Sequence, residues 1–98
     1  MVFSLGGYDF DGPFTSVDYL QEIPGIFIIS CKSDHSWSAL EIGQSENVAE
    51  YCRQLNDHRS DRSPGTIYYS AYYMPASNAG DRIMIEQDIR IQADLQCV

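Results

Sequence analysis

Three charged side chains are spaced so that a single helix would bring them together. Arg82, Glu86 and Arg90 follow one another at intervals of four residues, and residues four apart lie on the same face of a helix. A carboxylate in such a row can pair with the arginines one turn before and after it, or it can help to hold a divalent cation. The spacing favours ordinary ion pairs on the helix surface, and the metal-ligand role stays open as the alternative.

Cysteine and histidine do not form a recognisable metal site. Cys31, Cys52 and Cys97 are widely spaced without a CxxC pair, and neither His35 nor His58 has a Cys or His partner at ligand spacing. Zinc sites are built from clustered pairs of such ligands. We therefore expect no cofactor here. The odd number of separated cysteines favours a reducing compartment, and we expect a cytoplasmic protein.

The charge balance disfavours nucleic acid as a partner. The 98 residues include 14 acidic and 6 basic side chains, which gives a formal net charge of -8 at pH 7. Proteins that bind nucleic acid usually do so with clustered Lys and Arg, which release counterions from the phosphates. The longest apolar run, residues 26–29, is far shorter than the ~20 residues of a membrane-spanning helix. A soluble protein with a protein partner is therefore expected.

The apolar pattern that must position these side chains predicts one α+β domain over residues 1–98. An apolar, β-branched run at 25–31 and an alternating stretch at 37–43 predict two strands paired as a hairpin. The tyrosine-rich stretch 66–74 predicts a third strand. After an irregular or edge-strand N-terminal arm over 1–23, the expected order is ββαβα, with a small antiparallel or mixed sheet of about three strands.

Two helices complete this prediction. Ser45 is the expected N-cap of the first, which extends to about residue 58, and Asn78 or Asp81 is expected to cap the second. The predicted apolar stripe of the second helix is Met84, Ile85, Ile89 and Leu95.

The hairpin and both helices are expected to share one hydrophobic core. Register decides which side chains face it, because a slip of one residue turns the apolar face of a strand toward water. The predicted members are Ile26, Ile28, Leu40, Ile42, Val48, Cys52, Leu55, Ile85 and Ile89.

Four short motifs occur in order along residues 24–95. They are Gly-Ile-Phe on the first expected strand, Glu-Ile-Gly on the second, Ser-Glu-Asn-Val at the start of the first helix, and Arg-Ile-Met-Ile-Glu on the last helix. This series resembles the GIY-YIG nuclease domain. The resemblance implies cleavage of a phosphodiester, with a glutamate holding Mg²⁺ or Mn²⁺, an arginine facing the phosphate and tyrosines serving the nucleophile.

The catalytic positions implied by this resemblance are mostly altered. Glu86 falls where the family has its metal-binding glutamate, but Phe27 and Glu41 stand at the two tyrosine positions and Tyr51 at the arginine position. Arg53, the nearest arginine, is about 200° further around the helix and is expected to face solvent. The family scaffold positions that match are Gly25, Ile26, Ile42, Gly43 and Asn47.

The tyrosines of the third strand supply a second candidate site. Tyr68 and Tyr72 must lie on one face of the strand, with Tyr69 and Tyr73 on the other. One pair is expected to pack in the core. The other pair is a candidate protein-binding surface, because tyrosine is enriched at interfaces.

The altered positions predict a catalytically degenerate GIY-YIG-like domain that acts as a binding or regulatory module. Two alternatives stay open. In the first, the chain is a divergent nuclease in which Glu86 and Glu41 hold the metal. In the second, the acidic surface imitates DNA and occupies a DNA-binding protein.

Overall fold

The apolar runs of the chain build a single antiparallel sheet with helices on both faces. The computed structural model describes residues 2–33, 36–58 and 66–96. In it β3 (Gly25–Ser33) and β4 (Ser36–Ser45) pair as the predicted hairpin, and β5 (Thr66–Tyr73) pairs antiparallel with the other side of β3. The α+β class and the order ββαβα from residue 25 onward agree with the prediction.

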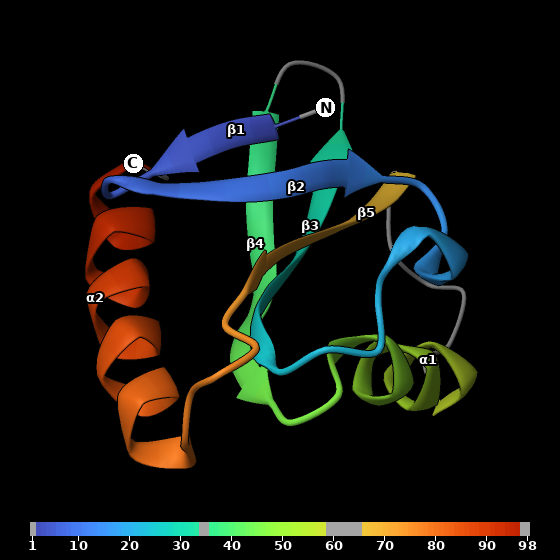
Figure 1. Cartoon of the computed structure of the whole chain (residues 1–98). Coiled ribbons are helices and arrows are strands. Elements are labelled where there is room, and N and C mark those ends of the chain that lie inside the picture. The colour runs from blue at the N-terminus through green and yellow to red at the C-terminus, as the bar shows by residue number, and fades with distance from the viewer. Residues whose placement is uncertain (1, 34–35, 59–65, 97–98) are drawn as a thin grey trace.

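The N-terminal arm adds two strands that the sequence did not predict as a hairpin. β1 (Val2–Leu5) and β2 (Tyr8–Phe14) pair with each other, and β2 also pairs with β5. The sheet therefore has five strands in the order β1-β2-β5-β3-β4 rather than about three (Figure 1). Gly6 and Gly7 do not break the structure, because their positive φ angles of 62° and 87° make the turn that joins the two strands.

Helix α1 (Val48–His58) begins two residues later than expected, which corrects the predicted cap. The Asn47 side chain accepts a hydrogen bond from the Glu50 backbone N–H at 3.1 Å, so Asn47 is the N-cap. Ser45 is instead the last residue of β4, and its hydroxyl accepts from the Asn47 N–H at 3.0 Å. A short 3-10 helix, η1 (Val17–Tyr19), lies beside α1.

Helix α2 (Ala79–Gln96) has the predicted cap but a different buried face. The Asn78 side chain accepts from the Asp81 N–H at 2.9 Å. Ile89 is fully buried and Ile85 is partly buried, whereas Met84 is 71% exposed, so its place in the apolar stripe was wrong. The buried face includes Arg82, at 2% exposure, because its guanidinium finds hydrogen-bond acceptors there. The side chain of Leu95 lies outside the described residues.

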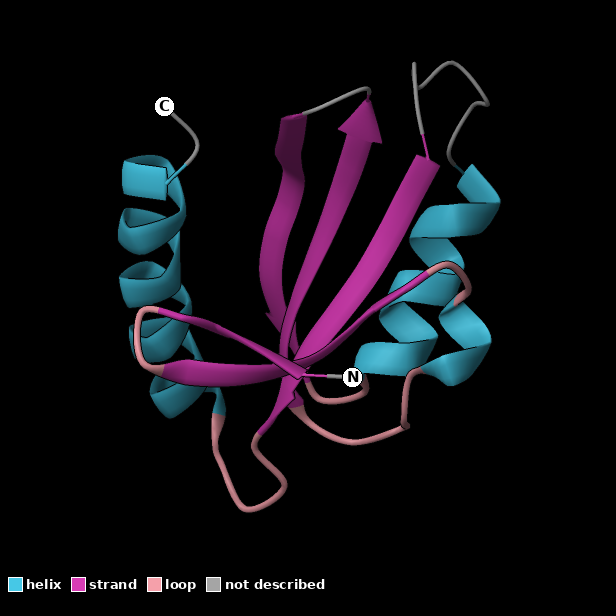
Figure 2. Cartoon of the chain, turned by 90° about the horizontal axis from the view of Figure 1, so that it is seen from above, coloured by secondary structure: helices cyan, strands magenta, loops and turns pink. Residues whose placement is uncertain are grey.

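The sheet buries both faces, so the expected single core is two clusters. Figure 2 shows α1 and α2 on opposite sides of the sheet. Alternate residues of β3 face the two helices: Phe27 and Ile29 belong to the α1-side cluster, and Ile26 and Ile28 belong to the α2-side cluster. The remaining predicted core members divide in the same way, with Val48, Cys52 and Leu55 on the α1 side and Ile42, Ile85 and Ile89 on the α2 side.

Leu40 is the predicted core residue that the structure places outside the core. It is 45% exposed, although Ile42 on the same strand is buried. Ile29 is opposite Glu41 and Ser30 is opposite Ala39, so Leu40 is the extra residue of a β-bulge in β4. A bulge changes which side chains face the core, and strict alternation across it fails.

Candidate functional site

Phe27 and Tyr51, which the GIY-YIG resemblance would place at two catalytic positions, are in contact. Their ring centroids are 5.0 Å apart, with Phe27 on β3 and Tyr51 on α1. Phe27 is 1% exposed and Tyr51 is 40% exposed, so the Tyr51 ring covers Phe27 at the edge of the α1-side core. Arg53 is exposed as predicted and lies 3.9 Å from Glu22. The contact between the two rings is therefore core packing.

The two motif glycines make room for close packing. A Cβ on Gly43 would lie 2.6 Å from Cζ of Phe27, and a Cβ on Gly25 would lie 2.4 Å from the carbonyl oxygen of Tyr72. Real Cβ atoms do not come this close to other atoms. Gly43 thus gives the Phe27 ring its space above β4, and Gly25 lets β3 and β5 approach each other.

Glu41 also lies on the α1 side of the sheet. It is opposite Ile29 in the β3–β4 ladder and is partly buried. Burial, with a smaller effect from the nearby Glu41 carboxylate, raises the pKa of the Cys52 thiol to about 12. This thiol is neutral and shielded at physiological pH, so it is not a ready nucleophile or metal ligand.

Glu86 lies on α2, which covers the opposite face of the sheet. Its carboxylate is 3.6 Å from the Arg90 guanidinium, and its side chain is 18% exposed. Arg90 also donates to the Ile42 carbonyl, and Arg82 donates to the Gln44 side chain at 2.8 Å. The helix-surface ion pair predicted from the spacing is present for Glu86 and Arg90.

The structure therefore divides the implied catalytic set. Phe27, Glu41 and Tyr51 are on the α1 side, whereas Glu86 projects from the helix on the α2 side. Among the residues that the structure describes, no three His, Cys, Asp or Glu side chains gather as they would around a metal ion. His35, Cys97 and the side chain of His58 lie outside the described residues.

The four tyrosines of β5 divide between the two faces as predicted, and three of them are partly buried rather than fully buried. Tyr69 is 5% exposed and belongs to the α1-side cluster, against which Tyr73 also packs. The Tyr73 hydroxyl accepts from the Gln21 N–H at 3.0 Å, and burial raises its pKa. Tyr72 packs on the α2 side against the rings of Tyr8 and Phe10. Tyr68 is partly buried.

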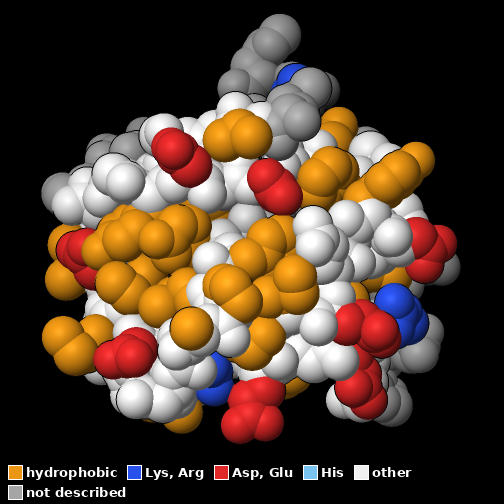
Figure 3. Space-filling view, in the orientation of Figure 1, with side chains coloured by type: hydrophobic (Ala, Val, Ile, Leu, Met, Phe, Trp, Pro, Cys, Tyr) orange, Lys and Arg blue, Asp and Glu red, His pale blue; other side chains and the backbone are white. Residues whose placement is uncertain are grey.

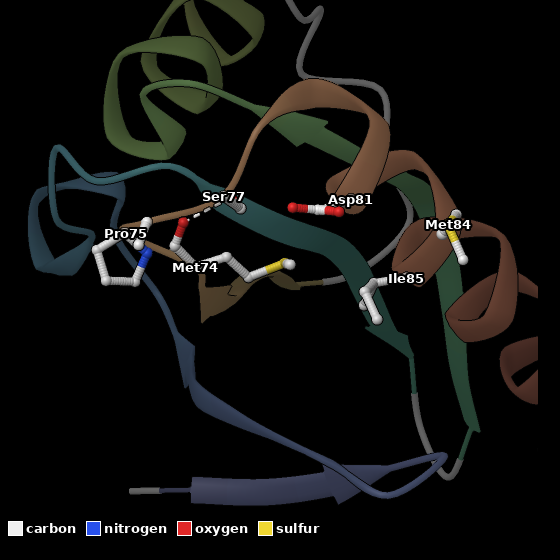
Figure 4. Close-up of a pocket in the computed structure, with 7 residues that line it drawn as sticks. Met74, Pro75, Ser77, Asp81, Met84 and Ile85 are labelled. Atoms are coloured by element: carbon white, nitrogen blue, oxygen red, sulfur yellow. Dashed lines mark hydrogen bonds between the residues drawn. The ribbon is translucent and has the colours of Figure 1, made fainter.

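A hollow of about 490 Å³ lies between the end of β5 and the first turns of α2. Figure 4 shows the Met74 side chain extending across it toward Ile85, with the Asp81 carboxylate at one side. The Ser77 hydroxyl closes the loop between β5 and α2 by donating a hydrogen bond to the Met74 carbonyl at 2.6 Å. The full lining is Met74, Pro75, Ala76, Ser77, Asp81, Met84 and Ile85.

Sequence reasoning did not identify this hollow. Met84 and Ile85 were both predicted to lie in the buried stripe, whereas they line the hollow. The sequence does contain one signal: α2 carries more apolar residues than a single buried stripe can hold. Ile83, Met84 and Ile91 are the ones left exposed.

Comparison of the chain with protein-family models, curated proteins and solved structures finds no match. No helix of the described part of the chain is long and apolar enough to cross a membrane.

Proposed function

We propose that this domain is a protein-binding module built on a GIY-YIG-like scaffold that has lost nuclease chemistry. The observation that carries the proposal is the packing of Phe27, which is 1% exposed and contacts both Gly43 and the ring of Tyr51. The family uses a tyrosine hydroxyl at this position. Here there is no hydroxyl, and the ring itself is part of the core.

The environment of Glu86 supports the same conclusion. A metal-binding carboxylate for phosphodiester cleavage has to face the phosphate together with the other catalytic groups. Glu86 is paired with Arg90, and the residues at the other implied catalytic positions belong to the opposite face of the sheet. An arginine is also missing where the family has one, because Tyr51 fills that position.

A protein partner fits the surface better than nucleic acid does. The net charge of -8 repels a polyanion at long range. The largely apolar hollow beside α2 offers a place for an apolar side chain of a partner.

The test is a cleavage assay with Mg²⁺ or Mn²⁺ on single-stranded, double-stranded and branched DNA and on RNA. We expect no cleavage, because loss of one well-placed catalytic group already costs about 10²- to 10⁴-fold in rate. Glu86→Ala and the exposed control Glu46→Ala should behave like the wild type. Specific cleavage that disappears in Glu86→Ala and persists in Glu46→Ala would refute the proposal in favour of a divergent nuclease.

A further inference from the structure

We propose that the exposed face of α2, together with the adjoining hollow, docks a cationic amphipathic helix of the partner protein. The partner helix places apolar side chains against Met84, Ile91 and the hollow, and Lys or Arg side chains against Asp81 and Asp88. This inference rests on the proposed binding function and specifies its surface and its ligand.

The face is a stripe with heptad spacing. Asp81, Met84, Asp88 and Ile91 are separated by three, four and three residues, the spacing that keeps side chains on one side of a helix where a second helix can pack. Met84 is 71% exposed and Ile91 is 59% exposed, and both carboxylates are exposed. The stripe is about 15 Å long, at a rise of about 1.5 Å per residue. It therefore presents two apolar and two acidic side chains to one partner helix.

The hollow extends this stripe toward the loop after β5. Met84 belongs to both, and Met74 and Ile85 continue the apolar lining from it. Hydrophobic side chains gather on this face of the molecule, over the region below β2 between α2 and the chain leaving β5 (Figure 3). Methionine side chains are flexible and polarizable, so they adapt to an apolar side chain inserted from outside. The hollow is thus a socket for one anchor residue of the partner.

The charge of the stripe determines the charge of the partner. The arginines of α2 are engaged away from it, because Arg82 is 2% exposed and Arg90 bonds to Glu86 and to the Ile42 carbonyl. Asp88 accepts a hydrogen bond from the Tyr8 hydroxyl at 2.9 Å, which holds the carboxylate in place. Asp81 has no ion pair with any other residue in the described part of the chain. An apolar ligand with Lys or Arg at the same heptad spacing satisfies both carboxylates.

This charge also disfavours the other occupants. A second copy of the chain would bring its own Asp81 and Asp88 to the contact and a further net charge of -8. DNA, RNA and an anionic membrane would all be repelled by the same carboxylates. The negative field that repels these occupants attracts a cationic helix.

The experiment measures binding of the full chain to a synthetic helix of about three heptads with Leu and Lys at the contact positions. Fluorescence anisotropy gives the affinity, and ¹H–¹⁵N NMR maps the contacted residues. The comparison peptide has Glu in place of Lys. We expect the Lys peptide to bind at least about tenfold more tightly than the Glu peptide, with the preference falling as salt is raised.

Matched variants separate local contacts from total charge. Asp81→Asn/Asp88→Asn should weaken binding about tenfold, since each rim pair contributes modestly. Asp18→Asn/Glu46→Gln changes the net charge equally on the α1 side and should leave the affinity within about twofold. Met84→Ser/Ile91→Ser should also weaken binding about tenfold, whereas Tyr19→Ser, at an exposed position beside α1, should not.

The possible failures of this inference differ from failure of the proposed function. If both charge variants weaken binding alike, or if NMR shifts cluster on the α1 side, the assigned surface is wrong although protein binding stands. If the Lys peptide does not bind, or binds no better than the Glu peptide, the assigned partner chemistry is wrong. Only metal-dependent cleavage that requires Glu86 overturns the proposed function itself.

Discussion

Replacing Gly43 with alanine tests whether the glycine of the Glu-Ile-Gly motif is required for packing. The new Cβ would lie 2.6 Å from Cζ of Phe27 and 3.1 Å from a second ring carbon, so the ring or the strand has to move. The ring has little room, because it is 1% exposed and also packs against Tyr51. Overpacking of this kind costs about 1–3 kcal/mol. For a domain of this size that corresponds to a fall in Tm of roughly 4–8 °C per kcal/mol.

A double-mutant cycle with Phe27→Leu identifies the cause of this cost. Leucine leaves space where the ring atoms were, so Gly43→Ala should cost little in the Phe27→Leu background. We expect a coupling energy of about 1–2 kcal/mol between the two sites. Urea unfolding followed by far-UV circular dichroism gives the four free energies of unfolding that the cycle requires.

Gly25→Ala is the control for this cycle. Its Cβ would meet the backbone oxygen of Tyr72 at 2.4 Å, and no truncation of a side chain removes that atom. Its cost should therefore be the same in the wild type and in Phe27→Leu. A neutral Gly43→Ala, or an equal cost of Gly43→Ala in both backgrounds, would refute the packing explanation.

Three further predictions concern the helices and the buried thiol. Ile89→Ala should lower the free energy of unfolding by about 2–5 kcal/mol, whereas Met84→Ala, at 71% exposure, should change it by less than about 0.5 kcal/mol in the same urea titrations. Asn78→Ala should cost about 0.5–2 kcal/mol, because the N–H of Asp81 loses its acceptor; no loss of helical signal or stability would contradict this cap. Burial, and to a smaller extent Glu41, raises the pKa of the Cys52 thiol to about 12 in the folded protein. As the pH rises, the thiol therefore loses its proton at a lower pH in the unfolded chain than in the folded one. The resulting contribution to the free energy of unfolding is complete below about pH 8.5 and declines as the pH rises toward 12. Between pH 7 and pH 10, urea titrations should therefore show a larger fall in the free energy of unfolding for wild type than for Cys52→Ala. Equal falls would contradict this prediction.

The parts of the fold that were predicted correctly are set by local patterns. The β3–β4 hairpin follows from two adjacent stretches of strand-forming residues, and α1 and α2 follow from apolar residues at helical spacing. The β1–β2 hairpin was missed because its turn, Gly6-Gly7, reads equally well as a break in an irregular segment. The bulge at Leu40 was missed because Leu40 and Ile42 flank Glu41 as they would in a regular strand, so nothing in the sequence marks Leu40 as the inserted residue.

Burial on α2 depends on contacts between residues that are far apart in the sequence. Hydropathy placed Met84 inside and left Arg82 for the surface, yet the structure has the reverse. Arg82 is buried because Gln44 and Ser77 supply acceptors for its guanidinium. These partners are distant in the sequence or depend on the shape of a loop, so the residue type alone cannot reveal them.

The candidate catalytic site depends on the same long-range information. Helical spacing correctly placed Glu86 beside Arg90, but it could not tell which face of the sheet α2 would cover. Alternation along β3 puts Phe27 and Ile26 on opposite faces, but it does not reveal that each face is covered by a different helix. The division of the implied catalytic set between two faces is therefore visible only once the helices are packed.

Glu86 has a structural explanation that requires no metal. β4 is an edge strand, and unpaired edge groups are a liability unless another element covers them. Arg90 donates to the Ile42 carbonyl of this strand, and Glu86 lies 3.6 Å from Arg90 and so helps to orient its guanidinium toward the edge. A carboxylate one turn before Arg90 therefore helps α2 to cover the edge strand. Because Glu86 has this structural role, its presence at this position is not in itself evidence for catalysis.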